Sequence, residues 1–492
     1  MKNYILSIDA GTTGITILII DKKTNVLDKY YSEFTQYYPR PGWVEHDGEE
    51  IWDVTKQLLN NVFLKYNSKN CAGIGITNQR ETTLIWNKNN NKPIYNAIVW
   101  QCKRTESICN KIKSSKNAQK FIDKTGLIID SYFSATKIKW LLENIDGARS
   151  LAKKGVLAFG TIDSWILWKL TNGKIHATAH TNASRPLIYN IDTLSWDDEL
   201  LSILKIPKKI LPTVKKSCYN FGVTNLQFIK NSIPITGIAG DQQAALYGQK
   251  CINPGDTKCT YGTGCFLLTN IGNKRIKTKS GLITTLACDI NGNPIYAIEG
   301  SVFMGGAIIQ WLRDELEIIK KTNDSEKIAL SVDSSNNVII VPAFTGLGAP
   351  YWDMNVRGII TGLTRGTNKK HIVRAALESI AFQVNDILKA IIKDTKINLN
   401  NLKVDGGACK NNFLMQFQSN LINLDIERPK NIESTALGAG MLAGLKAGFW
   451  KNTQDMFKKR TIDEIFTCKM EDLERKKYLN SWKKAIKMAT KK

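Results

Sequence analysis

Short apolar runs interrupted by glycine-rich turns recur along this chain, and they predict strands joined by tight connections. Residues 4 to 20 read as strand, turn and strand, with YILSID and ITILII on either side of AGTTG. The pattern returns at residues 256 to 270, where Gly262, Thr263 and Gly264 form the turn. Two such hairpins, about half a chain apart, suggest a duplicated domain with a phosphate bound between the copies.

The first of these turns also carries polar groups at the end of a strand. Its backbone N–H groups and threonine hydroxyls are free to approach an anion such as a phosphate. Asp9 ends the first strand, where a carboxylate could hold a metal ion directly or through water. A plain β-hairpin is the alternative for this turn taken alone, and the repetition of the pattern argues against it.

A third pattern places a carboxylate between a strand and a helix. Residues 233 to 239 form an apolar run that meets Gly240 and Asp241 and continues into a helix of small residues, 242 to 248. Open α/β sheets bind ligands at such breaks, so Asp241 is a candidate catalytic residue. The position also suits a helix cap, although a capping box would need Glu or Gln where Ala244 stands.

Two further turns carry candidate chemistry. Residues 73 to 86 predict two strands around a turn that contains Arg80 and Glu81. Arg80 is a hydrogen-bond donor and Glu81 an acceptor, so the two side chains could bind a ligand that carries hydroxyl groups. Adjacent charges on a turn are usually solvated, which is the alternative. Residues 404 to 412 (VDGGACKNN) follow a strand and open a helix near Asn411, and their bare backbone would let a nucleotide approach.

The length and the pattern together predict the domain organisation. A chain of 492 residues is too long for one ordinary core, so we expect two large domains. The segment QKCINPGD at residues 249 to 256 is the expected boundary, which gives domains of residues 1–250 and 251–492. Helices are expected at residues 135 to 144 and 371 to 394, with an amphipathic basic helix at the C-terminal end.

Composition and cysteine usage narrow the class of protein. With 43% hydrophobic and 23% charged residues, the chain has the composition of a globular protein. No apolar run reaches the length of a membrane span, and the N-terminus lacks the pattern of a signal peptide. Ten cysteines lie scattered without a C-x-x-C pair, which favours free thiols in a reducing cytoplasm.

The net charge of +24 is compatible with a polyanionic partner. Lysine and asparagine are abundant throughout the chain, however, and the basic residues do not gather with interleaved aromatic residues as they do in nucleic-acid-binding segments. We therefore expect no nucleic-acid partner, and we note that a basic protein suits a phosphate-bearing substrate.

Four segments resemble motifs of the FGGY carbohydrate kinase family, and in particular of its glycerol kinases, within the actin-like ATPase superfamily. These segments are IDAGTT (8–13), YFSATKIKWLLEN (132–144), GIITGLTRGTNKKHIVRAALE (358–378) and LGAGMLAGLKAGFW (437–450). The resemblance covers essentially the whole chain. It implies an α/β fold of two ribonuclease-H-like domains with a cleft between them, with ATP and Mg²⁺ on one side and glycerol on the other.

The resemblance also implies which residues form the two sites. On the glycerol side, five residues match the polyol motifs and two match aromatic walls: Arg80, Glu81, Tyr132, Asp241 and Gln242, with Trp100 and Phe266. On the nucleotide side, the matching residues are Thr12, Thr13, Gly14 and Thr263 at the phosphates, with Gly306, Gln310, Gly407 and Asn411. Asp9 would hold Mg²⁺, and Asp241 would accept the proton of the attacking hydroxyl.

Two positions depart from the family pattern. The family usually carries an arginine three residues after the second threonine of the first turn, and here that position is Thr16. Bacterial glycerol kinases that fructose 1,6-bisphosphate inhibits carry an arginine just before the IPI run, and here that position is Ser232. We therefore expect a weakened hold on the phosphates and weak or absent inhibition, and no control by phosphorylation of a histidine-containing loop.

The residues and the resemblance together predict a cytoplasmic enzyme that uses ATP to phosphorylate glycerol to sn-glycerol 3-phosphate. The resemblance alone implies a homo-oligomer, a dimer or tetramer. A related kinase acting on a pentulose, a tetritol or gluconate is the nearest alternative, and the matched polyol set favours a small triol over these. An actin-like filament protein or a chaperone-type ATPase is an alternative of another class. Such a protein would have no acceptor pocket, and its ATPase would not respond to added polyol.

Overall fold

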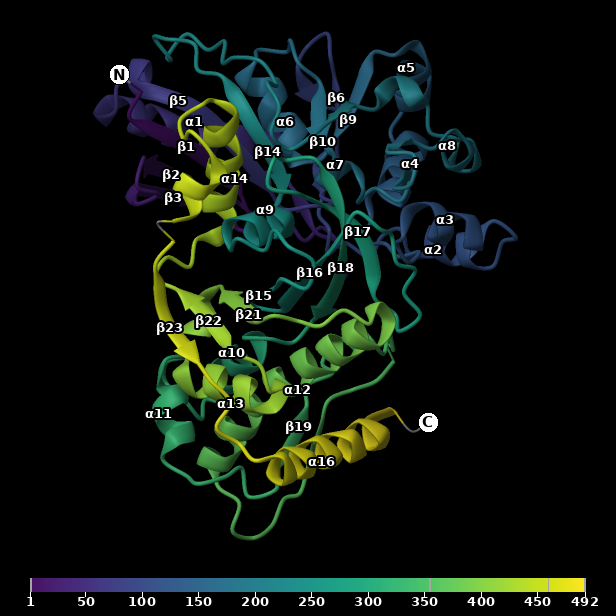
Figure 1. Cartoon of the computed structure of the whole chain (residues 1–492). Coiled ribbons are helices and arrows are strands. Elements are labelled where there is room, and N and C mark those ends of the chain that lie inside the picture. The colour runs from purple at the N-terminus through teal and green to yellow at the C-terminus, as the bar shows by residue number, and fades with distance from the viewer. Residues whose placement is uncertain (1, 354, 459, 491–492) are drawn as a thin grey trace.

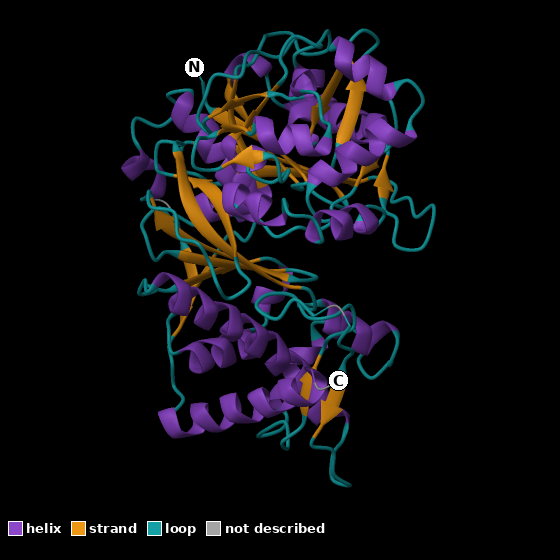
Figure 2. Ribbon diagram, turned by 90° about the vertical axis from the view of Figure 1, so that its right-hand side faces the viewer, coloured by secondary structure: helices purple, strands orange, loops and turns teal. Residues whose placement is uncertain are grey.

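The computed structural model describes residues 2–353, 355–458 and 460–490. Two large sheets form two halves of the molecule, which lie one above the other in Figure 1. Helices flank the strands of both halves (Figure 2). We call the five-stranded sheet and the elements packed on it the upper half, and the seven-stranded sheet with its helices the lower half.

The sheet of the upper half has the strand order β14-β5-β1-β2-β3. Strands β1, β5 and β14 are parallel, and β2 and β3 continue the sheet in antiparallel pairs. Because the three parallel strands end at one edge, the residues that follow them are brought together there. The strands are β1 (Tyr4–Ala10), β2 (Gly14–Asp21), β3 (Val26–Glu33), β5 (Cys71–Asn78) and β14 (Ile235–Gly240).

The sheet of the lower half repeats this arrangement within its order β17-β18-β16-β15-β21-β22-β23. Strands β15, β21 and β22 are parallel, and β16 and β18 follow in antiparallel pairs. The repetition confirms the duplication that the two hairpins predicted. The strands are β15 (Thr257–Tyr261), β16 (Cys265–Gly272), β17 (Ile283–Cys288), β18 (Pro294–Val302), β21 (Leu402–Asp405), β22 (Ile426–Pro429) and β23 (Ile462–Phe466).

Helices cover both faces of the upper sheet, which explains why its central strands are apolar on both sides. Leu6 and Ile8 of β1 pack in the cluster that contains α1 and α6, whereas Ile5 packs in the cluster that contains α14. The helices of this half and of the connections around it are α1 (Gly48–Lys65), α2 (Glu106–Lys113), α3 (Ala118–Thr125), α4 (Ser134–Asn144), α5 (Ala148–Lys154), α6 (Ile162–Leu170), α7 (His180–Ala183), α8 (Asp198–Leu204), α9 (Asp241–Gly248), α14 (Ser434–Lys446) and α15 (Thr453–Phe457).

The long helix α12 lies at the centre of the lower half, and the C-terminal helix α16 packs onto it through Trp482, whose ring stacks on Phe382 at 5.0 Å between centroids. The helices of this half are α10 (Ala307–Asp314), α11 (Asp324–Leu330), α12 (Lys369–Thr395), α13 (Asn412–Ile422) and α16 (Asp472–Thr490). Small strands complete the fold: β4 (Glu45–His46), β6 (Leu84–Asn87), β7 (Lys92–Pro93), β8 (Ala97–Ile98), β9 (Leu157–Gly160), β10 (Ala177–Ala179), β11 (Tyr189–Asn190), β12 (Ser195–Trp196), β13 (Thr213–Lys215), β19 (Ile339–Val341) and β20 (Ile359–Thr361).

The elements expected from the sequence are present. The strand-turn-helix around Asp241 is β14 followed by α9, and the helices expected at residues 135 to 144 and 371 to 394 are α4 and α12. The expected amphipathic terminal helix is α16, which buries one face. Among the residues that the structure describes, no helix is both long enough and apolar enough to cross a membrane.

Helix α14 comes late in the chain but packs in the upper half, where its backbone lies directly against α9 and β5. A Cβ added at Gly438 would lie 1.8 Å from the carbonyl oxygen of Ala244 in α9. A Cβ added at Gly75 in β5 would lie 2.2 Å from the carbonyl oxygen of Ala439. Helix α14, from the second half of the chain, therefore packs with the strands of the first half. The division into domains of residues 1–250 and 251–492 stays a prediction.

We predict that Gly438→Ala destabilises the protein although alanine favours a helix more than glycine does. The added methyl group meets backbone of α9, which cannot move aside as a flexible side chain can. The expected loss is about 2–3 kcal/mol of unfolding free energy, measured by urea denaturation. Gly366→Ala is the control, because the nearest atom to a Cβ there is a side-chain oxygen at 3.8 Å. Equal stability of the two variants would contradict the packing argument.

Candidate active site

The two glycine-rich turns of the hairpins expose their threonines. An N–H at the start of each turn donates to a carbonyl at its end, over residues 11–14 at 3.0 Å and over residues 262–264 at 2.9 Å. The side chains of Thr13 and Thr263 are exposed at the two turns. Gly14 has no room for a side chain, because a Cβ there would lie 2.5 Å from a carbonyl oxygen of β3. Each turn presents a hydroxyl group and bare backbone.

Thr12 is fixed in the first turn by two neighbours. Its carbonyl accepts a hydrogen bond from Gln36 Nε2 at 3.0 Å, and its hydroxyl accepts one from Trp100 Nε1 at 3.0 Å. The indole therefore connects the first turn to the aromatic residues described below.

Three glycine turns meet in the lower half. A Cβ added at Gly306 would lie 2.8 Å from the carbonyl oxygen of Gly262 and 3.8 Å from the Cβ of Ala408. Gly406 has a φ of +85°, and a Cβ there would lie 2.5 Å from the last carbonyl oxygen of β15. Around Gly407, no atom lies within 4 Å of an added Cβ. This packing brings open backbone at residue 407 beside the second hairpin turn.

Two other predicted nucleotide residues lie near these turns. Gln310 is exposed on α10, the helix that Gly306 caps. Asn411 is the N-cap of α13: its Oδ1 accepts from the Leu414 N–H at 2.9 Å, and its Nδ2 donates to Ser325 Oγ at 3.3 Å. Asn411 therefore has a structural role as well, with one N–H left over.

Asp241 begins α9 and is not its cap. Gly240 occupies the N-cap position, and the Asp241 Oδ1 accepts from the neighbouring Gln242 N–H at 2.7 Å. The same oxygen lies 3.0 Å from Arg80 Nε, and 28% of the Asp241 side chain is exposed. One edge of the carboxylate is thus held in place, while part of it remains accessible.

The turn that carries Arg80 and Glu81 is buried, so the solvated alternative is wrong. Only 2% of Arg80 and 1% of Glu81 are exposed. Glu81 has a φ of +63°, and the Thr82 N–H donates to the Arg80 carbonyl at 2.8 Å, which closes a three-residue γ-turn around Glu81. A non-glycine residue in this conformation is strained by about 1–3 kcal/mol, and such strain concentrates at functional sites.

Helix α4 holds this strained turn from behind. Ser134 Oγ donates to the Glu81 carbonyl at 2.9 Å, and Lys137 Nζ donates to the same carbonyl at 3.4 Å and to the Tyr132 carbonyl at 2.7 Å. Lys137 is completely buried, and burial lowers its pKa to about 8. The segment at residues 132–144 therefore fixes the positions of Glu81 and Tyr132 relative to each other.

Gln242 is oriented by a lysine from the lower half. Lys258 of β15 is completely buried, and its Nζ donates to Gln242 Oε1 and, at 2.8 Å, to Thr260 Oγ1. Burial lowers the pKa of Lys258. Lys258 occupies the Gln242 oxygen, and Gln242 Nε2 donates to Asp241 Oδ2 at 3.3 Å, so one N–H of the Gln242 amide group is left for a further partner.

Aromatic rings from both halves lie beside these polar groups. The Trp100 ring contacts Tyr132 at 5.6 Å and Phe266 at 6.3 Å between centroids, edge to face in both cases. Trp100 and Tyr132 come from the upper half, and Phe266 comes from β16. All three are partly exposed, as the walls of a binding site would be.

Asp9 lies across the β1–β2 pair from Thr16. Burial raises the pKa of Asp9 to about 7, and the negative charge of Asp241 acts in the same direction. Lys29 opposes these effects weakly. An arginine at position 16 would stand directly across from this carboxylate, and Thr16 supplies no such charge.

Besides Lys258, two charged residues of this site were not predicted from the sequence. Arg185, just after α7, and Glu299, on β18, are both fully buried and pair with the Arg80–Glu81 turn. The signal for Glu299 is its place in the otherwise uncharged strand PIYAIEGSV, where a lone carboxylate requires a buried partner. No sequence pattern indicates which partner that is.

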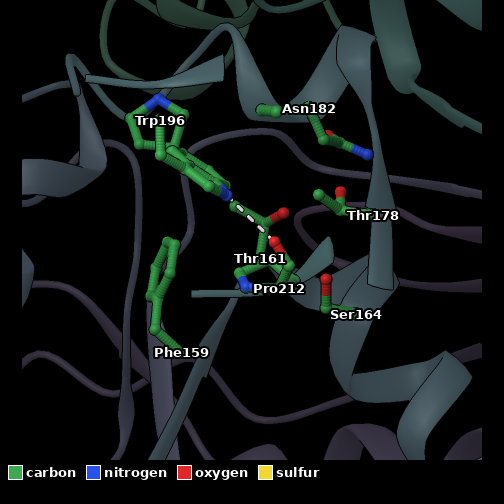
Figure 3. A pocket seen from close by; sticks show the side chains of 9 residues that line it. Phe159, Thr161, Ser164, Thr178, Asn182, Trp196 and Pro212 are labelled. Carbon is green, nitrogen blue, oxygen red and sulfur yellow. Dashed lines mark hydrogen bonds between the residues drawn. The ribbon is translucent and has the colours of Figure 1, made fainter. Parts of the chain in front are cut away.

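Two cavities in the described structure lie apart from the predicted residues. Figure 3 shows the smaller one, of about 10 Å³, in which Trp196 Nε1 donates to the Pro212 carbonyl at 2.9 Å. It has room for about one water molecule, which would suit the buried and unpartnered Oδ1 of Asn182 at its wall. A groove of about 750 Å³ beside α14 and β22 also contains none of the predicted site residues.

Residues 4–248 match the N-terminal domain and residues 257–447 the C-terminal domain of the FGGY family of carbohydrate kinases. Two curated proteins named glycerol kinase, from Carboxydothermus hydrogenoformans and Clostridium botulinum, are each 53% identical to this chain. The matches cover 99% of this chain and 98% and 99% of the two relatives.

Solved structures show the same similarity. The crystal structure of Plasmodium falciparum glycerol kinase with ADP superposes with a TM-score of 0.94 at 39% identity, covering 100% of this chain and 99% of that one. Gluconate kinase from Lactobacillus acidophilus gives a TM-score of 0.88 at 25% identity, covering 99% and 97%. The chain therefore belongs to the FGGY family of carbohydrate kinases and has the two-domain fold of that family, of the actin-like ATPase type.

Proposed function

We propose that this protein transfers the γ-phosphoryl group of ATP to glycerol and forms sn-glycerol 3-phosphate. The observation that carries the proposal is the partly exposed Asp241 carboxylate, held at 3.0 Å by Arg80 beside an acceptor, Glu81. Two proteins named glycerol kinase, 53% identical to this chain over nearly its whole length, support the choice of glycerol.

In this proposal Asp241 is the general base. Its Oδ2, which accepts one long hydrogen bond from Gln242 Nε2 at 3.3 Å, has a lone pair left to accept the proton of the terminal hydroxyl as that oxygen attacks the γ-phosphorus and ADP leaves. Phosphoryl transfer needs little covalent help from a protein, so most of the acceleration comes from positioning and from stabilising charge. The contact with Arg80 at 3.0 Å fixes the position of the base.

Glycerol binding would use the groups that remain free around Asp241. Arg80 and the Gln242 amide donate to hydroxyl oxygens, Glu81 accepts from a hydroxyl, and Tyr132 adds its phenol. Trp100 and Phe266 would cover the carbon face of the triol. A site built from buried polar groups rejects acceptors that leave one of those groups unpaired.

ATP would lie across the glycine turns of the two halves. Thr12, Thr13 and Gly14 would face the phosphates from above and Thr263 from below, where backbone N–H groups favour anions. The rest of the nucleotide would lie along Gly306, Gln310, Gly407 and Asn411. The ADP in the Plasmodium falciparum structure supports an adenine nucleotide as substrate.

The residues present fit a magnesium ion. Mg²⁺ in kinases is usually held by one or two carboxylates together with substrate phosphates. Asp9 is a carboxylate whose pKa is raised by burial and by Asp241, so a cation nearby would relieve both effects. In the described part of the chain no three metal-binding side chains converge, which agrees with phosphates supplying most ligands. When bound, the ion would neutralise charge on the phosphates.

The proposal places the enzyme in the cytoplasm. All ten cysteines lie in the described part of the chain, each is free, and nine are buried, as expected in a reducing compartment. A dimer or tetramer stays a prediction that analytical ultracentrifugation would test. A gluconate or pentulose kinase remains the nearest alternative, because gluconate and xylulose kinases share the fold at 25% identity.

We predict that Asp241→Asn abolishes glycerol-dependent ADP release from Mg·ATP. Loss of a general base typically costs a factor of about 10²–10⁴ in rate. The control is Asp198→Asn, a substitution of a surface aspartate whose side chain is 76% exposed. ADP release that responds to a pentulose, a tetritol or gluconate but not to glycerol would mean that the enzyme phosphorylates that acceptor instead. ADP release that does not respond to any polyol would support the ATPase alternative.

We predict that Asp9→Asn stabilises the nucleotide-free protein, and more so at higher pH. Asp9 ionises near its ordinary pKa of 3.8 when unfolded and near 7 when folded, so its ionisation weakens the fold progressively between these values and fully above 7. The expected gain in unfolding free energy is near zero at pH 4 and about 2 kcal/mol at pH 8. The value at pH 8 is smaller than the full pKa shift would give, because solvent screens the partly exposed Asp9. Urea denaturation of both proteins across this pH range checks it, and a pH-independent difference would contradict it.

We predict that fructose 1,6-bisphosphate does not inhibit at physiological concentration. Ser232 is exposed and carries no charge for a bisphosphate, although Lys230 lies two residues away. Ser232→Arg should increase sensitivity if this position controls binding. Inhibition of the unmodified enzyme, measured as glycerol-dependent ADP release, would show that another residue provides the charge.

A further inference from the structure

Four buried charges stand behind the proposed glycerol site: Arg80, Glu81, Arg185 and Glu299. We call them the charge quartet. Each has at most 2% of its surface exposed. Arg80 and Glu81 lie in the strained turn of the upper half, Arg185 follows α7, and Glu299 comes from β18 of the lower half.

The two carboxylates are shared in an ordered way. Glu299 Oε2 accepts from Arg80 Nη1 at 2.5 Å, and Glu299 Oε1 accepts from Arg80 Nη2 at 3.2 Å and from Arg185 Nη2 at 2.8 Å. Arg185 Nε donates to Glu81 Oε1 at 2.5 Å. Arg185 therefore connects the two carboxylates, and Glu299 connects the two guanidinium groups.

The quartet is electrically balanced, with two positive and two negative charges. Burial alone would raise the pKa of Glu299, but Arg185 and Arg80 outweigh it and hold that pKa at about 2. Glu299 thus stays charged throughout the range in which the enzyme can be assayed, whereas burial raises the pKa of Glu81 against the opposing effect of Arg185 and Arg80. Burying four charges is costly and replacing them with apolar residues is often neutral, so stability alone does not explain the quartet.

The geometry indicates what the quartet does for the site. Glu299 accepts from Nη1 and Nη2 of Arg80, and Gln243 Oε1 accepts from Nη1 at 3.3 Å. Nε therefore faces Asp241 at 3.0 Å, and one Nη2 N–H is left for a hydroxyl group. Without Glu299, the whole guanidinium fork would be free to pair with the Asp241 carboxylate and cover it. Arg185 acts in the same way on Glu81, because it holds Oε1 and leaves the second oxygen for a ligand.

We propose that Arg185 and Glu299 are positioning residues that aim Glu81 and Arg80 at the acceptor hydroxyls and prevent Arg80 from covering Asp241. This inference rests on the proposed function. It assigns to the lower half a part in polyol binding: β17 and β18 lie where the halves meet (Figure 1), and the residues after β18 lead directly into the Gly305–Gly306 turn.

The test compares Glu299→Gln, Arg185→Lys and the double variant Arg185→Met/Glu299→Gln in steady-state kinetics. Glu299→Gln is expected to raise the KM for glycerol by about tenfold or more, with a change of less than about threefold in the KM for ATP. Arg185→Lys keeps the charge but cannot hold both carboxylates, so a smaller rise in the KM for glycerol is expected than in Glu299→Gln.

Acceptor choice provides a second measurement. Wild type should prefer glycerol to 1,2-propanediol and 1,3-propanediol, each of which lacks one hydroxyl, and the variants should lose at least about tenfold of that preference. The double variant removes one charge of each sign, so it remains electrically balanced and is expected to fold, which thermal unfolding checks. Its preference for glycerol should fall as well. Because this variant leaves no excess buried charge, such a fall would come from lost positioning and not from an unpaired charge.

Glu378→Gln is the matched control, since Glu378 is also 2% exposed and pairs with an arginine at 3.0 Å, but lies in α12. It should lower thermal stability without changing the KM for glycerol. Quartet variants that keep the glycerol KM and the acceptor preference of wild type would overturn the inference alone. A wild-type protein that does not phosphorylate glycerol would overturn the proposed function, and the inference with it.

Discussion

The contact between Arg80 and Glu299 is the interaction on which the geometry of the site depends. It joins a strained turn of the upper half to a strand of the lower half, at a place from which water is excluded. A buried guanidinium without its carboxylates would be very costly, so the two halves must bring these groups together in one relative arrangement. The same contact determines which edge of Arg80 reaches Asp241.

A second constraint is the close approach of backbones. Gly438 and Gly75 let α14 lie against α9 and β5 at distances that no Cβ allows, and Gly306 and Gly406 do the same for the turns of the lower half. The first pair fixes α9, and with it the direction of Asp241. The second pair leaves bare backbone where a phosphate or a nucleotide would lie. Glycine therefore serves helix packing behind the site in the upper half and exposes polar backbone at the site in the lower half.

Asp241 and Asp9, the two acidic groups proposed to act in the reaction, have different electrostatic surroundings. Asp241 has a guanidinium at 3.0 Å, whereas Asp9 has burial and a neighbouring negative charge, and its pKa rises to about 7. Two carboxylates with different surroundings can serve different purposes, one as a base and one as a cation ligand. Thr16, across from Asp9, leaves this pair without the additional cation that an arginine would supply.

The sequence alone predicted the strands, the repeated hairpins, the strand-turn-helix at Asp241 and, through the family resemblance, the residues around it. Those features are local in the chain, since hydrophobic period, glycine turns and short motifs are written in consecutive residues. Arg185, Glu299 and Lys258 escaped prediction because each acts on a partner far from it in the chain or in the other half. The burial of Arg80 and Glu81 likewise depended on what packs over their turn. Only the tertiary structure decides such matters, because the pairing of a buried charge depends on which distant group the fold places within hydrogen-bonding reach.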